Sequence, residues 1–127
     1  MKIFDCFMYF DEDVVLDLRL NYLSKYIDKF VIIESIYNHK GERRNPQFDI
    51  KKFHKFKEKI NYILTEKEPE NIEKVNDEDD HEEKSRKFII NAVKRENFQR
   101  NIISQGIIKA DNDDWIIISD LDEIPNL

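Results

Sequence analysis

The sequence contains one cysteine, no apolar run long enough for a membrane span, which takes about 20 residues, and no excess of basic residues. A single thiol cannot form a disulfide within the chain. Cys6 lies in an apolar run and is expected to be a small buried side chain in a reducing compartment. These absences exclude a disulfide scaffold and a membrane-spanning helix.

The chain has 27 acidic residues against 21 lysines and arginines, a formal net charge of −6. Nucleic-acid backbones require a basic face, and acids interrupt every basic cluster here, so we expect no nucleic-acid partner. Charge appears at Lys2 and Asp5, too early for a secretory signal. We therefore expect a cytoplasmic location.

Apolar β-branched runs alternate with helical patterns along the 127 residues. The predicted strands are 3–9, 29–36, 60–65 and a run that begins at Trp115. The predicted helices are 14–26, 49–57 and 84–110, with Ile50, Phe53 and Phe56 of the second facing inward. Such alternation is typical of one α/β domain with a Rossmann-like parallel sheet. The acidic segment 66–83 has little to bury and is expected to be a solvated loop or a mobile excursion.

The helix over 84–110 is expected to pack on the sheet through an apolar stripe of Ile89, Val93, Ile103 and Ile107. Glu96 and Arg100 fall within that stripe. Two interpretations are open: the two charges satisfy each other at i, i+4 spacing, or Arg100 points toward the last strand and holds a carboxylate or a phosphate. Gly106 is expected to allow close packing.

Three acids, Asp120, Asp122 and Glu123, follow the last apolar run directly. The run is typical of a strand buried on both faces, and ligands of open α/β sheets bind beyond the carboxyl ends of such strands. Like charges this close are tolerated best with a divalent cation and the phosphates that it carries. The alternative is a surface turn in which Asp120 caps the next segment and the other two acids are solvated.

Several segments resemble the N-terminal half of the family 17 glycosyltransferases. They are Asp5-Cys6-Phe7 with Phe10, Leu18-Arg19-Leu20 with Leu23, and the stretches 28–35, 39–41, 99–101 and 119–125. The Glu34-Ser35 pair and the Asp-Leu-Asp-Glu-Ile-Pro block are the most specific of these. The resemblance implies a GT-A type fold in which residues 1–127 are the N-terminal, donor-binding part and the sheet is incomplete at its C-terminus.

The resemblance also implies an inverting transfer of GlcNAc or a related sugar from a UDP-sugar donor to a glycan acceptor, assisted by Mn²⁺ or Mg²⁺. By position, Asp120 and Asp122 would bind the metal and the diphosphate. Arg100 would support the donor, and Glu34 and Ser35 would line the nucleotide pocket.

His39, Lys40 and the pair Arg43 and Arg44 would lie on a loop over the phosphates. A solvated histidine and ordinary surface arginines are the open alternatives at these positions. The resemblance covers no acceptor-binding half, and no residue can be assigned as the general base that an inverting transfer needs. The catalytic residue is therefore unknown from the sequence.

Two further hypotheses use the same features. The acids could hold a metal for phosphoryl chemistry, as in phosphohydrolases or Toprim-like nucleases, with Glu34 as the additional acid. A non-catalytic chain could instead associate with itself or dock through an exposed sheet edge onto a partner, such as a missing C-terminal half.

Overall fold

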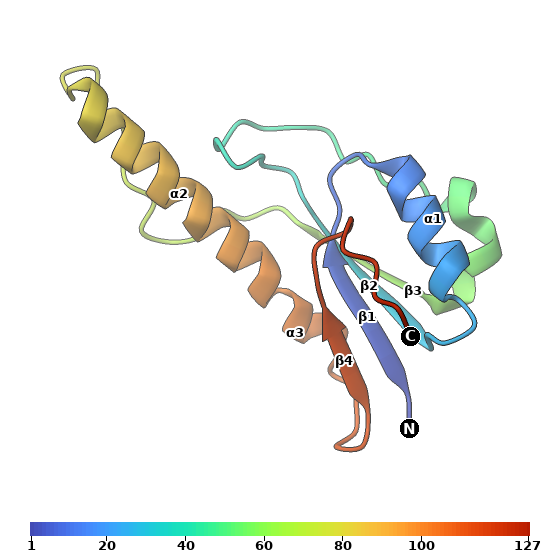
Figure 1. The fold of residues 1–127 in the computed structure, drawn as a ribbon. Helices are drawn as coiled ribbons and strands as arrows, with labels where there is room; N and C mark the ends of the chain where they lie inside the picture. Colours follow the sequence, from blue (N-terminus) through green and yellow to red (C-terminus); the bar gives the residue numbers. More distant parts are fainter.

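The computed structural model describes residues 1–127 as a four-stranded parallel sheet with helices on both faces (Figure 1). The strands β1 (Ile3–Met8), β2 (Lys29–Ser35), β3 (Ile60–Thr65) and β4 (Trp115–Ile118) lie in the order β3-β2-β1-β4. The helices are α1 (Asp13–Leu23), the 3₁₀ helix η1 (Ile50–Lys59), α2 (His81–Asn101) and α3 (Ile103–Gly106). The predicted α/β, Rossmann-like class is confirmed.

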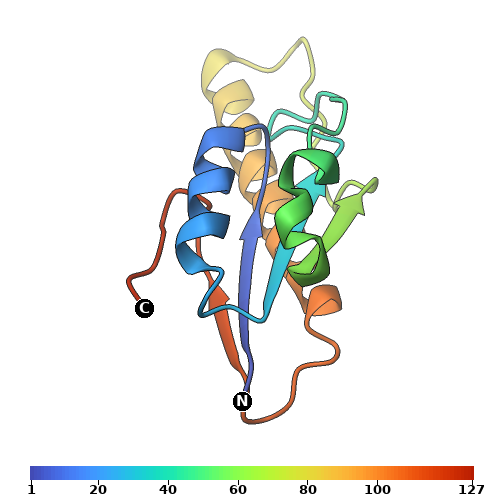
Figure 2. The same ribbon diagram turned by 90° about the vertical axis from the view of Figure 1, so that its right-hand side faces the viewer.

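The two central strands are buried on both faces, because side chains alternate between two apolar layers. Figure 2 shows α1 and η1 on the same face of the sheet. The apolar layer under them contains Phe7, Tyr9, Phe30, Ile32, Phe53 and Phe56. The opposite layer contains Phe4, Cys6, Val31 and Ile33 together with Ile103 of α3. Cys6 is fully buried, so the prediction of a small buried side chain is confirmed, and burial raises the pKa of its thiol to about 12. Ile50, predicted to face inward, is 39% exposed.

The strand β4 differs from its prediction. It pairs only with β1, at the edge of the sheet, and Trp115 and Ile118 are 65% and 52% exposed. The expectation of burial on both faces is wrong, because that pattern cannot reveal which strand will have a neighbour on one side only.

The long helix also differs. It begins at His81, where the side chain of Asp80 accepts a hydrogen bond from the backbone N–H of Glu83, and it is interrupted at Ile102 before α3. Of the predicted stripe, Ile103 is buried, but Ile89 and Val93 are exposed. The reason is that the N-terminal half of α2 projects beyond the sheet (Figure 1). Only the C-terminal part of this helical region packs on the strands.

The close packing predicted at Gly106 is confirmed. A Cβ atom there would lie 2.2 Å from Cγ1 of Val31, so only glycine lets α3 approach β2 this closely. No helix of the structure combines the length and the apolar character that a bilayer crossing requires.

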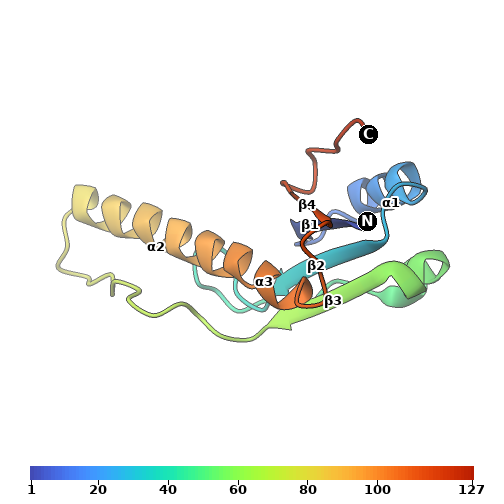
Figure 3. The same ribbon diagram turned by 90° about the horizontal axis from the view of Figure 1, so that it is seen from below.

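Residues 81–83 belong to α2, and the rest of the predicted acidic loop, residues 66–80, is irregular and mostly exposed, as expected of a solvated loop. It runs beside α2 (Figure 3). The side chain of Asn91 is buried and exchanges two hydrogen bonds with the backbone of Glu73, at 2.8 and 2.9 Å, while Lys87 pairs with Asp79 at 2.7 Å. These polar contacts tie the loop to the helix.

Candidate functional site

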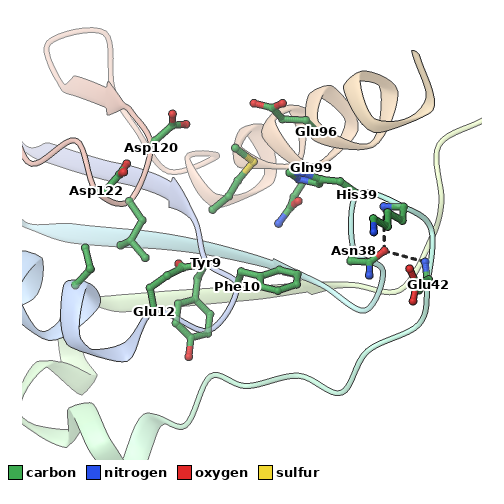
Figure 4. Close-up of a pocket in the computed structure, with 14 residues that line it drawn as sticks. Tyr9, Phe10, Glu12, Asn38, His39, Glu42, Glu96, Gln99, Asp120 and Asp122 are labelled. Atoms are coloured by element: carbon green, nitrogen blue, oxygen red, sulfur yellow. Dashed lines mark hydrogen bonds between the residues drawn. The ribbon is translucent and has the colours of Figure 1, made fainter. Parts of the chain in front are cut away.

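The carboxyl ends of the parallel strands border a cavity of about 780 Å³ (Figure 4). Four separate segments line it: the β1–α1 connection, residues 38–42 after β2, the C-terminal half of α2, and the residues that follow β4. This is the place where open α/β sheets bind ligands. Residues more than 100 positions apart, such as Phe10 and Asp120, meet here.

Asp120 and Asp122 both line this cavity. Both are exposed, and the side chain of Asp120 is 56% accessible. We call residues 119–123 the acid turn. Within it, the Glu123 carboxylate accepts from the backbone N–H of Asp120 at 2.9 Å, and the Glu123 N–H donates to the Asp120 carbonyl at 2.9 Å. Glu123 therefore closes the turn, and Asp120 and Asp122 remain directed to the cavity.

Arg100 forms both of the contacts that were predicted for it as alternatives. Its Nη2 atom is 3.1 Å from a carboxylate oxygen of Glu96 and 3.6 Å from one of Asp120. The intrahelical pair and the contact with the acid turn coexist. Since the three side chains are more than 40% exposed, the pairs are weak and the guanidinium is accessible to solvent. Arg100 itself does not line the cavity, although its partners Glu96 and Asp120 do.

Arg19 is the functional neighbour that the sequence reasoning missed. Its side chain is fully buried on α1 and forms a two-pronged pair with Asp5, at 2.6 and 2.8 Å. The same guanidinium donates to the carbonyls of Asp120, Leu121 and Glu123 at 2.7, 3.0 and 3.2 Å, and to Oγ of Ser119 at 2.7 Å. One signal was available: Arg19 stands among Leu16, Leu20 and Leu23 on the apolar side of its helix.

Glu34 and Ser35 do not line the cavity. The Glu34 carboxylate is fully buried and accepts four hydrogen bonds, from the Arg44 guanidinium, the Tyr62 hydroxyl and the N–H groups of Gln47 and Phe48. Burial and the bond to Glu34 raise the pKa of Tyr62. Ser35 accepts from the N–H of Tyr37 at 3.0 Å. The two residues hold the loop after β2, and a direct role at the nucleotide stays a prediction.

The loop after β2 brings His39 and Lys40 to the cavity. Gly41 turns the backbone here with a φ of +84°, and Arg95 donates to the His39 carbonyl at 3.1 Å. Arg44 instead binds Glu34 and stacks over the ring of Phe10 at 4.0 Å, while Arg43 is exposed. Of the predicted loop residues, His39 and Lys40 thus lie at the site.

The acid turn fits one mode of metal binding. No group of three or more His, Cys, Asp or Glu side chains is gathered to hold an ion. Asp120 and Asp122 supply two exposed carboxylates on one cavity. Mg²⁺ and similar ions are commonly held by one or two carboxylates, with substrate phosphates and water as the other ligands. The residues present fit an ion that arrives with a phosphate ligand.

The family comparison matches the description Glycosyltransferase family 17 over residues 1–127. The chain belongs to glycosyltransferase family 17. Comparisons with curated proteins and with solved structures gave no match. Membership of family 17 confirms the resemblance and makes the chain a glycosyltransferase, which uses a sugar donor and a glycan acceptor.

Family membership also favours glycosyl transfer over phosphoryl chemistry. The phosphoryl hypothesis needs an additional acid at an earlier strand end, and Glu34 is the acid at that position. Its carboxylate is enclosed by four donors and is not in the cavity wall, so this family 17 chain offers no such acid there.

Proposed function

We propose that this family 17 chain is the donor-binding part of a metal-dependent, inverting glycosyltransferase. The donor is a UDP-sugar that carries GlcNAc or a related sugar, and the acceptor is a glycan. One observation carries the proposal: Asp120 and Asp122 line the same cavity as His39, Lys40 and the end of β1, at the carboxyl edge of a parallel sheet.

The charge of the cavity supports a cation. Its wall contains five carboxylates, those of Glu12, Glu42, Glu96, Asp120 and Asp122, against one lysine, Lys40, and one histidine, His39. A diphosphate would be repelled by this excess of negative charge unless a divalent ion bound with it. The acidic wall therefore suits a metal–diphosphate pair better than a free anion.

Each residue near the acid turn has a proposed part. Asp120 and Asp122 would hold Mn²⁺ or Mg²⁺. When bound, the ion would act as a Lewis acid that stabilises the charge of the leaving diphosphate. Arg100 lowers the repulsion between the two carboxylates through its contact with Asp120, and its free N–H groups can donate to a phosphate oxygen.

Across the cavity, His39 and Lys40 offer donors to the diphosphate. Phe10 offers an aromatic ring whose position is fixed by the Arg44 guanidinium stacked over it. The wall across from Asp120 and Asp122 thus offers an aromatic ring and nitrogen donors, although Glu12 and Glu42 also lie on that side. No general base is assigned, since the Glu123 carboxylate is bonded within the acid turn.

The proposal is tested by isothermal titration with UDP and Mn²⁺. We expect Asp120→Asn and Asp122→Asn each to weaken binding of the pair by about 100-fold or more, because even outer-shell partners of metal sites contribute 10–100-fold. Asp17→Asn is the matched control, since Asp17 is exposed on α1 and binds only Asn21. Metal binding that is indifferent to UDP would contradict the proposal and favour phosphoryl chemistry.

A further inference from the structure

The buried guanidinium of Arg19 joins two parts of the chain that are distant in sequence. On one side it donates to the carboxylate of Asp5 on β1, and on the other side it donates to the acid turn. Every N–H direction of the group is used: Nε and Nη2 on the Asp5 carboxylate, Nη2 also on Ser119, and Nη1 on three backbone carbonyls. The site of these bonds is closed to water, because Arg19 and Asp5 are fully buried.

The geometry has a direct consequence for the two metal-binding candidates. The carbonyls of Asp120, Leu121 and Glu123 all accept from the Arg19 guanidinium, which fixes the peptide planes that follow Asp120 and precede Asp122. The plane after Asp122 is fixed within the turn, because the Glu123 N–H donates to the Asp120 carbonyl that Arg19 holds. When these planes are fixed, the directions of the Asp120 and Asp122 side chains are restricted as well. A flexible turn would have to lose this freedom on binding a cation, at a cost in affinity.

We propose that Arg19 is a positioning residue, which is anchored by Asp5 and holds the acid turn so that Asp120 and Asp122 face the cavity before a cation binds. The inference rests on the proposed function for its effect on metal affinity, whereas the hold on the turn does not depend on it. Asp5 fixes the orientation of the guanidinium and compensates its charge.

Arginine is required by this arrangement. A lysine ammonium has three donors on a point charge and cannot span a carboxylate, a hydroxyl and three carbonyls at once. Arg19→Lys keeps the buried positive charge beside Asp5, so it is the variant of choice. Ser119→Ala is milder, because it removes only the acceptor at 2.7 Å and the donor of a 3.2 Å bond to the Glu123 carbonyl.

The control variant must lower the stability of the fold as Arg19→Lys does, but at a residue that does not contact the acid turn. Leu23→Ala serves this purpose, since Leu23 is fully buried on the same helix and has no hydrogen bond to residues 119–123 through its side chain. The variants are compared at the same interval below their own melting temperatures. Under those conditions, differences in the turn do not reflect global stability.

The first measurement is amide hydrogen exchange at Asp120 and Glu123, whose N–H groups close the turn. We expect Arg19→Lys to accelerate exchange at these amides by about 10-fold or more over Leu23→Ala. Ser119→Ala should accelerate it by about 2- to 10-fold, as expected for the loss of one hydrogen bond. Exchange in Arg19→Lys and Ser119→Ala that equals that of Leu23→Ala would overturn the proposal.

The second measurement is the affinity for Mn²⁺ with UDP. Arg19→Lys should lose about 10- to 100-fold, as outer-shell partners of metal sites do, and Leu23→Ala should stay within about 2-fold. A loosened turn with unchanged affinity would also overturn the proposal. If the unaltered chain binds no metal with UDP, the proposed function fails, and the exchange measurement still decides whether Arg19 holds the turn. Should Arg19→Lys fail to fold, Ser119→Ala decides both measurements.

Discussion

The cavity edge of the sheet and the projecting half of α2 both depend on ion pairs, but the pairs differ in their surroundings. At the cavity edge, both side chains of the Asp5–Arg19 pair are fully buried. In the Glu34–Arg44 pair, the Glu34 side chain is fully buried and that of Arg44 is 12% exposed. Along α2, the two pairs of Arg86 involve side chains that are 36–45% exposed. Buried charges are tolerated only when hydrogen bonds satisfy them fully, so they fix geometry, whereas exposed pairs contribute little.

The largest effect is expected from Glu34→Ala. Removing this carboxylate leaves the Arg44 guanidinium and the Tyr62 hydroxyl without their partner and should destabilise the fold by about 3–5 kcal/mol. Urea unfolding measures the loss. Glu73→Ala, which breaks an exposed pair of α2, is the control and should cost less than about 1 kcal/mol. Equal losses in the two variants would remove the distinction between the two regions.

The next effect concerns the point where the helical region meets the sheet. Gly106→Ala places a Cβ atom 2.2 Å from Cγ1 of Val31 and should cost about 1–3 kcal/mol through overpacking. Gln105→Ala, at an exposed neighbouring position, controls for the change in helix propensity. In the Val31→Ala background, which lacks this Cγ1 atom, Gly106→Ala should cost less in thermal unfolding than it does in the unaltered chain. A neutral Gly106→Ala would show that α3 is not held closely on β2.

A smaller effect is expected from Arg86→Ala on the projecting half of α2. The variant should lose less than about 1 kcal/mol, and the difference should vanish in 1 M salt, where the Debye length is about 3 Å. The same salt should leave the loss in Glu34→Ala almost unchanged. Unfolding curves at low and high salt give this comparison directly, and a salt-independent loss at Arg86 would contradict it.

The smallest effect is a dependence of local stability on pH where the loop before α2 pairs with Lys87 of that helix. Hydrogen bonds from Lys87 and from the N–H of Asn76 lower the pKa of Asp79 below its ordinary value of 3.8. A lowered pKa stabilises the fold above that ordinary value, and the contribution is lost as the pH falls through the native pKa. The protection of the Asn76 amide, which is its exchange rate compared with that of an unstructured peptide at the same pH, should therefore decrease below about pH 4. Lys87→Met should flatten this dependence, and an unaltered profile would exclude the pair as its source.

Much of the sheet could be predicted from the sequence. The predicted strand 60–65 agrees with β3, and the predictions for β1 and β2 extend one residue too far. The agreement is close because an unbroken apolar, β-branched run indicates a strand whichever strands lie beside it. The place of the acids at a strand end followed from the same runs.

Features that depend on distant partners could not be predicted in this way. The exposure of Ile89 depends on how far α2 extends past the sheet, and the edge position of β4 depends on the strand order. The contacts of Arg19 with the acid turn are 100 to 104 residues away and involve mainly backbone carbonyls, which carry no residue identity. Only the unexpected charge on an apolar helix face indicated that a partner was required.

The single thiol gives the chain a natural reporter. Cys6 is fully covered in the centre of β1, between β2 and β4, and its pKa of about 12 keeps it protonated in the native state. An alkylating reagent can therefore modify it only after these strands separate. The rate of labelling at neutral pH measures opening of the sheet in the unaltered sequence, without an added dye or an introduced residue.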